Sequence, residues 1–181
     1  MKYYKTIQLK DGRKCVIRNA VAEDAQAVLD CFILTHSETD ELLSYPEEIT
    51  FTVEQEEKYL QGREESADEI EIIAEVDGRI VGMTGVDRIS RAEKIRHRAG
   101  FGISVEKAYW GLGIGRAMTL ACIECAKKAG YVQLELEVVA DNAKAIALYE
   151  SAGFVEYGRN PLGFRSRISG WQELVSMRLE L

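Results

Sequence analysis

The sequence lacks any long run of apolar residues. No stretch approaches the roughly 20 residues that a membrane-spanning helix needs, so a membrane protein is not expected. The first residues, MKYYKTIQLKDGRK, have no apolar core between their lysines, which is atypical of a secretory signal peptide. Both absences favour a cytoplasmic protein.

Cysteine is also scarce. The four cysteines are expected to be free thiols in a cytoplasmic chain; they are Cys15, Cys31, Cys122 and Cys125. The last two form a C-x-x-C pair, but this pair lies well inside a predicted helix and not at its start, where the helix dipole could lower a thiol pKa. We therefore interpret the cysteines as packing residues and not as a redox centre.

Positive charge is in deficit. The chain has 23 basic and 30 acidic residues and a net charge of −7, which argues against nucleic-acid binding because that partner requires a basic surface. An acidic balance suits a cationic small substrate, although many proteins are acidic for solubility alone. The sequence also has no repeats and no low-complexity segment, and its 181 residues suit one domain over residues 1–181.

The spacing of apolar residues predicts an α/β domain. A helix is expected from Ala22, because apolar residues then recur every three or four positions, and Thr52 with Gln55 resembles a capping box that opens a second helix. Two further helices are expected over 114–129 and 142–152, each closed by a glycine. Strands are expected around Asp11-Gly12 and Asp77-Gly78 and at 97–105, 133–139, 154–158 and 170–181, with the basic segment RNPLGFRSRISG as a loop.

A glycine-rich stretch, GLGIGR at 111–116, joins the strand FGISV to a helix. The first turn of a helix carries unpaired N–H groups and a partial positive charge, and glycine lets an anion approach them closely. The stretch therefore predicts a diphosphate cradle with Arg116 nearby. The dinucleotide fingerprint fails, because Ala117 or Met118 stands where its third glycine belongs, and the nucleotide P-loop fails because no Gly-Lys-Ser/Thr follows. A tight turn without a ligand is the remaining alternative.

Several motifs together resemble the GNAT N-acetyltransferase superfamily. Residues 110–115, WGLGIG, occupy the family's acetyl-CoA pattern Gln/Arg-x-x-Gly-x-Gly/Ala, with Trp110 as the departure. Ile103-Ser104-Val105 matches the strand before that pattern, and Leu136-Glu137-Val138 followed by Asn142 matches a later strand and helix start. The stretch AIALYESAGF at 145–154 is most similar to ribosomal-protein N-terminal acetyltransferases, and the resemblance covers roughly residues 70–160.

The resemblance implies a fold and a cosubstrate. The fold is a mixed, mostly antiparallel sheet of about seven strands with about four helices. Acetyl-CoA is the acyl donor, no metal takes part, and the acceptor is a primary amine of a small molecule or of a peptide or protein N-terminus. The residues that this resemblance assigns to the donor are Ile103, Ser104, Val105, Gly111, Leu112, Gly113, Ile114, Gly115, Arg116, Asn142 and Tyr149.

The same resemblance suggests catalytic residues. Tyr149 matches the family's general acid for the leaving thiolate; without the motif it would be interpreted as a core aromatic residue. The base has three candidates. Glu137 shares a strand face with Gln133 and Glu135, His97 lies six residues before Ile103, and bulk water acting on a neutral amine is the third. The second histidine, at the end of the first helix, is expected at the surface.

The acceptor site is predicted least well. The family resemblance implies that two segments line it: the region between the first two helices and the loop before the last strand. The acidic residues of the first segment could attract a polyamine, an aminoglycoside or a basic peptide N-terminus, or could simply be solvated; they are Glu38, Asp40, Glu41, Glu47 and Glu48. A non-catalytic acyl-CoA-binding module and, more distantly, a nucleotide-binding protein stay open as alternatives, as does the oligomeric state, a homodimer included.

Overall fold

The computed structural model describes residues 1–181 and contains one eight-stranded sheet in the order β1-β2-β3-β4-β5-β6-β8-β7. Every neighbouring pair is antiparallel except β5 and β6. The sheet therefore has one strand more than the family resemblance led us to expect. The strands are β1 Tyr4–Gln8, β2 Lys14–Asn19, β3 Ile70–Val76, β4 Arg79–Arg88, β5 Arg98–Val105, β6 Gln133–Val139, β7 Val155–Ser166 and β8 Gly170–Glu180.

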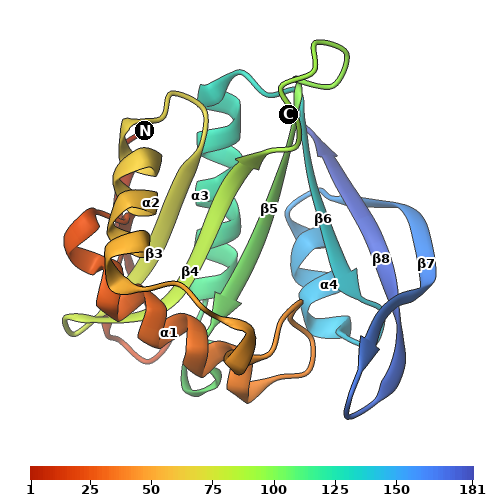
Figure 1. The fold of residues 1–181 in the computed structure, drawn as a ribbon, viewed down its shortest axis with the longest axis horizontal. Helices are drawn as coiled ribbons and strands as arrows, with labels where there is room; N and C mark the ends of the chain where they lie inside the picture. The colour runs from red at the N-terminus through yellow and green to blue at the C-terminus, as the bar shows by residue number, and fades with distance from the viewer.

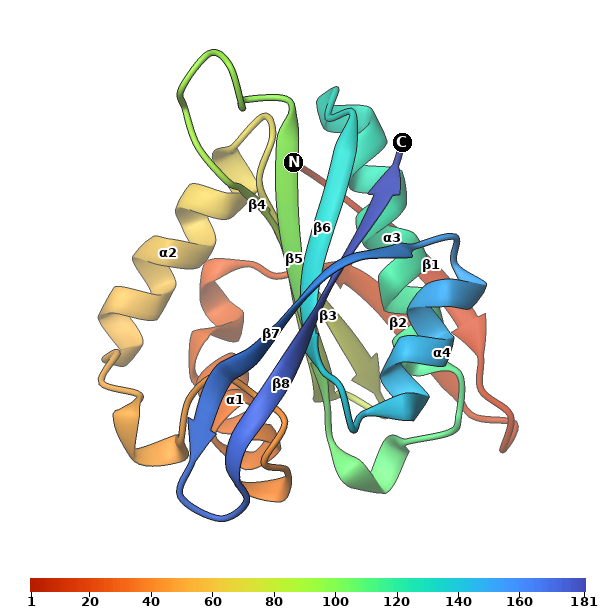
Figure 2. The ribbon, with the colours of Figure 1, turned by 90° about the vertical axis from the view of Figure 1, so that its right-hand side faces the viewer.

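Four α-helices cover the two faces of the sheet: α1 (Ala25–Glu38), α2 (Val53–Glu65), α3 (Ile114–Ala129) and α4 (Ala143–Ser151). Figure 2 shows α1 and α2 on one face and α3 and α4 on the other. None of these helices is long and apolar enough to span a lipid bilayer. The element order agrees with the order that the apolar spacing predicts.

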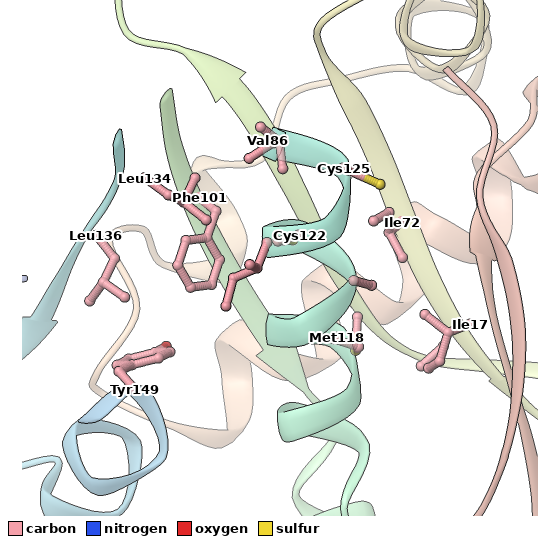
Figure 3. Packing of buried hydrophobic residues seen from close by; sticks show 14 of the residues in the cluster. Ile17, Ile72, Val86, Phe101, Met118, Cys122, Cys125, Leu134, Leu136 and Tyr149 are labelled. Atoms are coloured by element: carbon pink, nitrogen blue, oxygen red, sulfur yellow. The ribbon is translucent and has the colours of Figure 1, made fainter. Parts of the chain in front are cut away.

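The main hydrophobic core lies between the sheet and α3. Met118, Cys122 and Cys125 are spaced three or four residues apart on α3, so one face of the helix carries all three into the core (Figure 3). All four cysteines are free and buried, in agreement with the packing interpretation. A smaller core forms between the other face of the sheet and α1 with α2.

The helix ends follow the sequence signals. Thr52 and Gln55 form the expected capping box at the start of α2, with each side chain bonded to the main-chain N–H of the other residue. Gly130 and Gly153 take φ angles of 84° and 98° after α3 and α4, where a residue with a β-carbon would be strained. The first helix is preceded by a short 3-10 turn over Ala22–Asp24.

The segment predicted as a basic loop, RNPLGFRSRISG, is mostly strand. It forms the last eight of the twelve residues of β7, the hairpin turn and the first residue of β8. The pairing of β7 with β8 slips between Glu156 and Gly158 and again between Asn160 and Phe164. The second irregularity accommodates Pro161, which an edge strand tolerates because one of its sides needs no hydrogen bonds. These irregularities hide the two-residue period that would have indicated a strand.

The pair β5–β6 determines where the sheet opens. These two strands pair only over Arg98–Gly100 and Gln133–Glu135. Beyond that point β5 stays with β4 as far as Val105, and β6 stays with β8. Figure 1 shows the two strands parting, with α4 visible between them. We call this opening the strand gap.

Candidate active site

The edge of β5 that faces the strand gap carries free main-chain groups. Glu106 donates its N–H to the carbonyl of Val81 at 2.9 Å, and Arg98 accepts from Ile89 at 3.3 Å, so the even-numbered residues of β5 bond β4. Because main-chain groups alternate along a strand, the N–H and C=O of Ile103 and Val105 point into the gap. The predicted residue Ser104 points its main chain towards β4 instead.

Trp110 closes one end of this edge. Its indole N–H donates to the carbonyl of Val105 at 2.6 Å, and Lys107 Nζ lies 5.9 Å from the centre of the ring. The sequence departs from the family pattern at this position. The indole therefore makes a polar contact of its own there, which the motif comparison did not predict.

The glycine-rich stretch forms a cradle of free donors. Gly111 and Gly113 have φ angles of 78° and 103°, a conformation that glycine adopts without strain. The first helical bond runs from Ala117 N–H to the carbonyl of Gly113 at 3.1 Å. None of the six N–H groups of residues 111–116 has an acceptor within the protein. Six adjacent donors at a helix N-terminus suit an anion such as a diphosphate.

Two predicted cradle residues also contact α4. The Arg116 guanidinium donates to Ser151 Oγ at 2.7 Å, which links α3 to α4. A β-carbon on Gly115 would lie 3.4 Å from Leu148 Cδ2, an ordinary packing distance. Backbone conformation therefore explains Gly111 and Gly113, whereas a small side chain at Gly115 would fit against α4.

Tyr149 lies on the α4 side of the strand gap. Its ring meets Phe101 edge-on, with 5.8 Å between the ring centres, and Figure 3 shows it pointing from α4 towards α3. The residue is 7% exposed, and no protein group forms a hydrogen bond with its hydroxyl. Burial, together with Cys122, raises the pKa of Tyr149, so the phenol stays protonated at neutral pH.

Glu137 lies on the opposite side of the sheet. It alternates with Leu136, which is in the core beside α3, so its side chain projects from the α1–α2 face and is exposed. Ser176 Oγ donates to it at 3.3 Å. Glu137 follows the last β5–β6 pair by two residues, which places it across the strand gap from Gly102. Tyr149 and Glu137 thus approach the gap from opposite faces.

Glu135 is the buried glutamate of this strand. The guanidinium of Arg98 binds both of its carboxylate oxygens. This ion pair lowers the pKa of Glu135, which makes Glu135 a poor proton acceptor. Among the polar residues of this face of β6, Glu137 is the glutamate without an ion-pair partner.

The structure does not bring either histidine to the strand gap. His97 lies in the turn before β5, not on the strand as expected, and its side chain is exposed. Six residues of extended chain separate it from Ile103 by roughly 20 Å. His36, expected at the surface, is buried; it stacks on Phe32 and its Nδ1 lies 2.8 Å from the carbonyl of that residue.

Asn142 caps α4, as predicted. Its Oδ1 accepts from the N–H of Ala145 at 3.0 Å. Its Nδ2 donates to Glu41 in the α1–α2 connection at 2.7 Å. Both polar atoms of the side chain are therefore engaged within the protein.

The acidic residues of the α1–α2 connection are all bonded. Asp40 accepts from Ser166 and Ser169 of the β7–β8 hairpin, both at 2.7 Å. The other four bind the main-chain N–H of Lys107, the Asn142 amide, Arg167 and the main-chain N–H of Tyr45; they are Glu38, Glu41, Glu47 and Glu48. These acids bind other groups of the protein and so hold the connection in place. They are therefore neither a free binding site for a cation nor merely solvated residues.

The connection and the hairpin are the two segments that the family resemblance assigned to the acceptor. The structure brings them side by side, and they enclose a cavity of about 190 Å³. The walls come from residues 39–40 and 42–45 on one side and from residues 163–166 with Gln172 on the other. The sequence predicted the neighbourhood but not the bonds that form it.

Comparisons with known proteins agree with these features. Residues 34–154 match the acetyltransferase (GNAT) family. A stretch of 56 residues, 31% of this chain, is 50% identical to the ribosomal protein bS18-alanine N-acetyltransferase of Escherichia coli K12 but covers only 38% of that protein. The chain thus spans well under two thirds of the length of this curated relative.

Two solved structures extend the similarity to nearly the whole chain. A GNAT-family acetyltransferase from Streptococcus pneumoniae is 26% identical with a TM-score of 0.88, covering 92% of this chain and 99% of that one. A ribosomal-protein-alanine N-acetyltransferase from Brucella melitensis is 27% identical with a TM-score of 0.79, covering 91% and 99%.

Proposed function

The chain belongs to the GNAT acetyltransferase family, and from this premise we propose that it is an acetyl-CoA-dependent N-acetyltransferase that acts on a primary amine by direct attack. One observation carries the proposal. Residues 111–116 supply free N–H donors at one end of the strand gap. The protonated phenol of Tyr149 lies on one face of the gap and the exposed carboxylate of Glu137 on the other.

The donor is held by main-chain groups in this proposal. The N–H groups of residues 111–116 bind its diphosphate. The N–H and C=O of Ile103 and the N–H of Val105 pair with the pantetheine arm as a further strand would, while the Val105 carbonyl stays bonded to Trp110. The Asn142 amide can bind acetyl-CoA once its hydrogen bond to Glu41 is broken. When bound, acetyl-CoA supplies an activated acetyl thioester.

The side chains then perform three tasks. The N–H of Ile103 donates to the thioester carbonyl and stabilises the negative charge that develops on its oxygen. Glu137 takes a proton from the attacking amine, directly or through one water, as the new C–N bond forms. Tyr149 gives a proton to the sulfur as the C–S bond breaks. Glu137 is preferred to His97 because His97 lies near the opposite end of β5.

The alternative is an acyl-CoA-binding module that performs no chemistry. Such a module needs the cradle but not Tyr149 or Glu137. The presence of an unbonded phenol and an exposed carboxylate on opposite faces of the gap favours the enzyme. We also propose that residues 1–181 form one domain, since one sheet runs through them, and that the protein is cytoplasmic, since its buried thiols are unpaired.

A thiol-release assay tests the proposal. Purified protein, acetyl-CoA and a panel of amines and peptides should release free CoA, and Tyr149→Phe should lower kcat by about 100-fold. Tyr4→Phe is the matched control, because Tyr4 is 71% exposed and far from the core. Thermal stabilisation by acetyl-CoA without turnover of any acceptor would support the non-catalytic binding module and contradict the enzyme.

A further inference from the structure

Two largely buried glutamates lie on the α1–α2 face of the sheet. Glu71 on β3 is 7% exposed and Glu56 on α2 is 6% exposed, and neither carboxylate forms an ion pair within the protein. Burial raises the pKa of both groups, and Asp87 raises that of Glu71 further; the nearby Arg63 and Tyr59 lower it only in part. Carboxylates that are largely buried without a cationic partner are costly, so these two call for a specific explanation.

The nearest cation is already engaged. Arg63 donates through Nη2 to Asp87, and its Nη1 lies 3.2 Å from Glu69. Its guanidinium also covers the ring of Tyr59, with 4.7 Å to the ring centre. The site therefore has more carboxylates than the protein supplies with positive charge.

Two glycines lie between Glu71 and the strand gap on this face of the sheet. The Glu71 carboxylate lies over Gly85 of β4, where a β-carbon would be only 2.7 Å from Oε2. Gly85 is directly opposite Gly102 of β5. Gly102 is exposed, and a β-carbon on it would have no neighbouring atom within 4 Å. No side chain of β4 or β5 therefore stands between Glu71 and the strand gap at this level of the sheet.

We propose that Glu71, with Glu56 beside it, binds a second cationic group of the acceptor, and that the acceptors are α,ω-diamines and similar doubly cationic amines. The inference rests on the function proposed above, since it places the reacting nitrogen in the strand gap. The path from Gly85 across β5 to the gap is about 7–10 Å, or nearly two strand spacings. A chain of about four to six carbons between two nitrogens spans that path.

Matched acceptors test the inference. Putrescine and 4-aminobutanol have the same length, but the alcohol replaces one ammonium by a hydroxyl. Wild-type protein should acetylate putrescine with a kcat/KM at least about tenfold higher. Glu71→Gln should reduce that ratio to nearly one while leaving activity on 4-aminobutanol within about twofold. Glu75→Gln, on the same strand but bonded to Arg18, should keep the wild-type ratio.

Calorimetry of putrescine with the CoA-bound protein gives a readout that needs no turnover. Putrescine should bind to wild type and not to Glu71→Gln, and thermal denaturation should show that both proteins are folded. This result would support the site even if no amine were acetylated. Equal use of the two acceptors, an unchanged ratio in Glu71→Gln, or equal putrescine binding by both proteins would overturn it. Failure of every amine to release thiol would instead count against the proposed function.

Discussion

The cradle and the acidic connection between α1 and α2 lie on the two sides of the strand gap and differ in how their polar groups are used. The cradle leaves the six N–H groups of residues 111–116 without acceptors. The connection is rich in charge, yet each of its five acids already accepts a hydrogen bond or ion pair from the protein. Free polar groups, and not charge alone, mark where a ligand belongs.

The largest effect is expected on the cradle side, from Gly113→Val. At a φ of 103° a side chain introduces about 1–3 kcal/mol of strain and distorts the donors. Acetyl-CoA should bind roughly tenfold to hundredfold more weakly by calorimetry. Gly115→Ala is the control: its β-carbon would lie 3.4 Å from Leu148 Cδ2, so affinity should change little. Equal losses in both variants would show that backbone conformation does not explain Gly113.

A smaller effect is expected in the connection, from Asp40→Ala. Both hydroxyl bonds to the β7–β8 hairpin disappear, so the free energy of unfolding in urea should fall by about 1–3 kcal/mol. Glu47→Ala should lower it by less than about 1 kcal/mol, because the Glu47–Arg167 pair is exposed. The affinity for acetyl-CoA should stay near wild type in both. A large loss of affinity in Asp40→Ala would mean that the connection binds the donor.

The pH dependence of the free energy of unfolding should reveal buried His36, which lies in the last turn of α1 just before the connection. Burial lowers the pKa of His36 below its usual 6.5, so the unfolded chain binds a proton more readily than the folded one. The contribution to stability is complete above pH 6.5 and is lost as the pH falls through the folded pKa. In urea unfolding, His36→Gln should therefore lose less stability than wild type between pH 8 and pH 5. Parallel curves would contradict this assignment.

The smallest effect is expected from Glu41→Ala, because Glu41 of the connection binds Asn142 at the start of α4. Removing Glu41 frees the Asn142 amide, so the KM for acetyl-CoA should fall by about twofold. Glu38→Ala removes a neighbouring carboxylate that binds the main chain of Lys107 and should not reproduce the change. A higher KM in Glu41→Ala would indicate that Glu41 orders the site and does not compete for it.

Local signals made much of the fold and the cradle predictable. The capping box at Thr52, the glycines after α3 and α4, and the GLGIGR turn each act within a few residues of chain, so their patterns predict structure directly. The strand predicted at 154–158 in fact continues to residue 166, and its second part was missed because Pro161 and two pairing slips interrupt its period. Its pairing depends on β8, which the local sequence does not contain.

The acceptor side was beyond sequence reasoning for the same physical reason. Glu71 enters the proposed acceptor site only because Gly85 and Gly102 carry no side chain beside it and because Glu56 comes from a distant helix. The loop acids resembled a substrate site in sequence, yet their partners come from α4 and the β7–β8 hairpin. Burial and pairing of charges are tertiary properties, so a charge count cannot reveal them.

The short contact between β5 and β6 has a mechanical consequence. Only three residue pairs join the two parts of the sheet directly, while each part is continuous within itself. A cosubstrate arm bound between them would form main-chain hydrogen bonds where β5 and β6 form none with each other, and so would join the two parts of the sheet. Occupancy should then stiffen the whole molecule, so that amide hydrogen exchange slows along both bordering strands and not merely where the ligand touches.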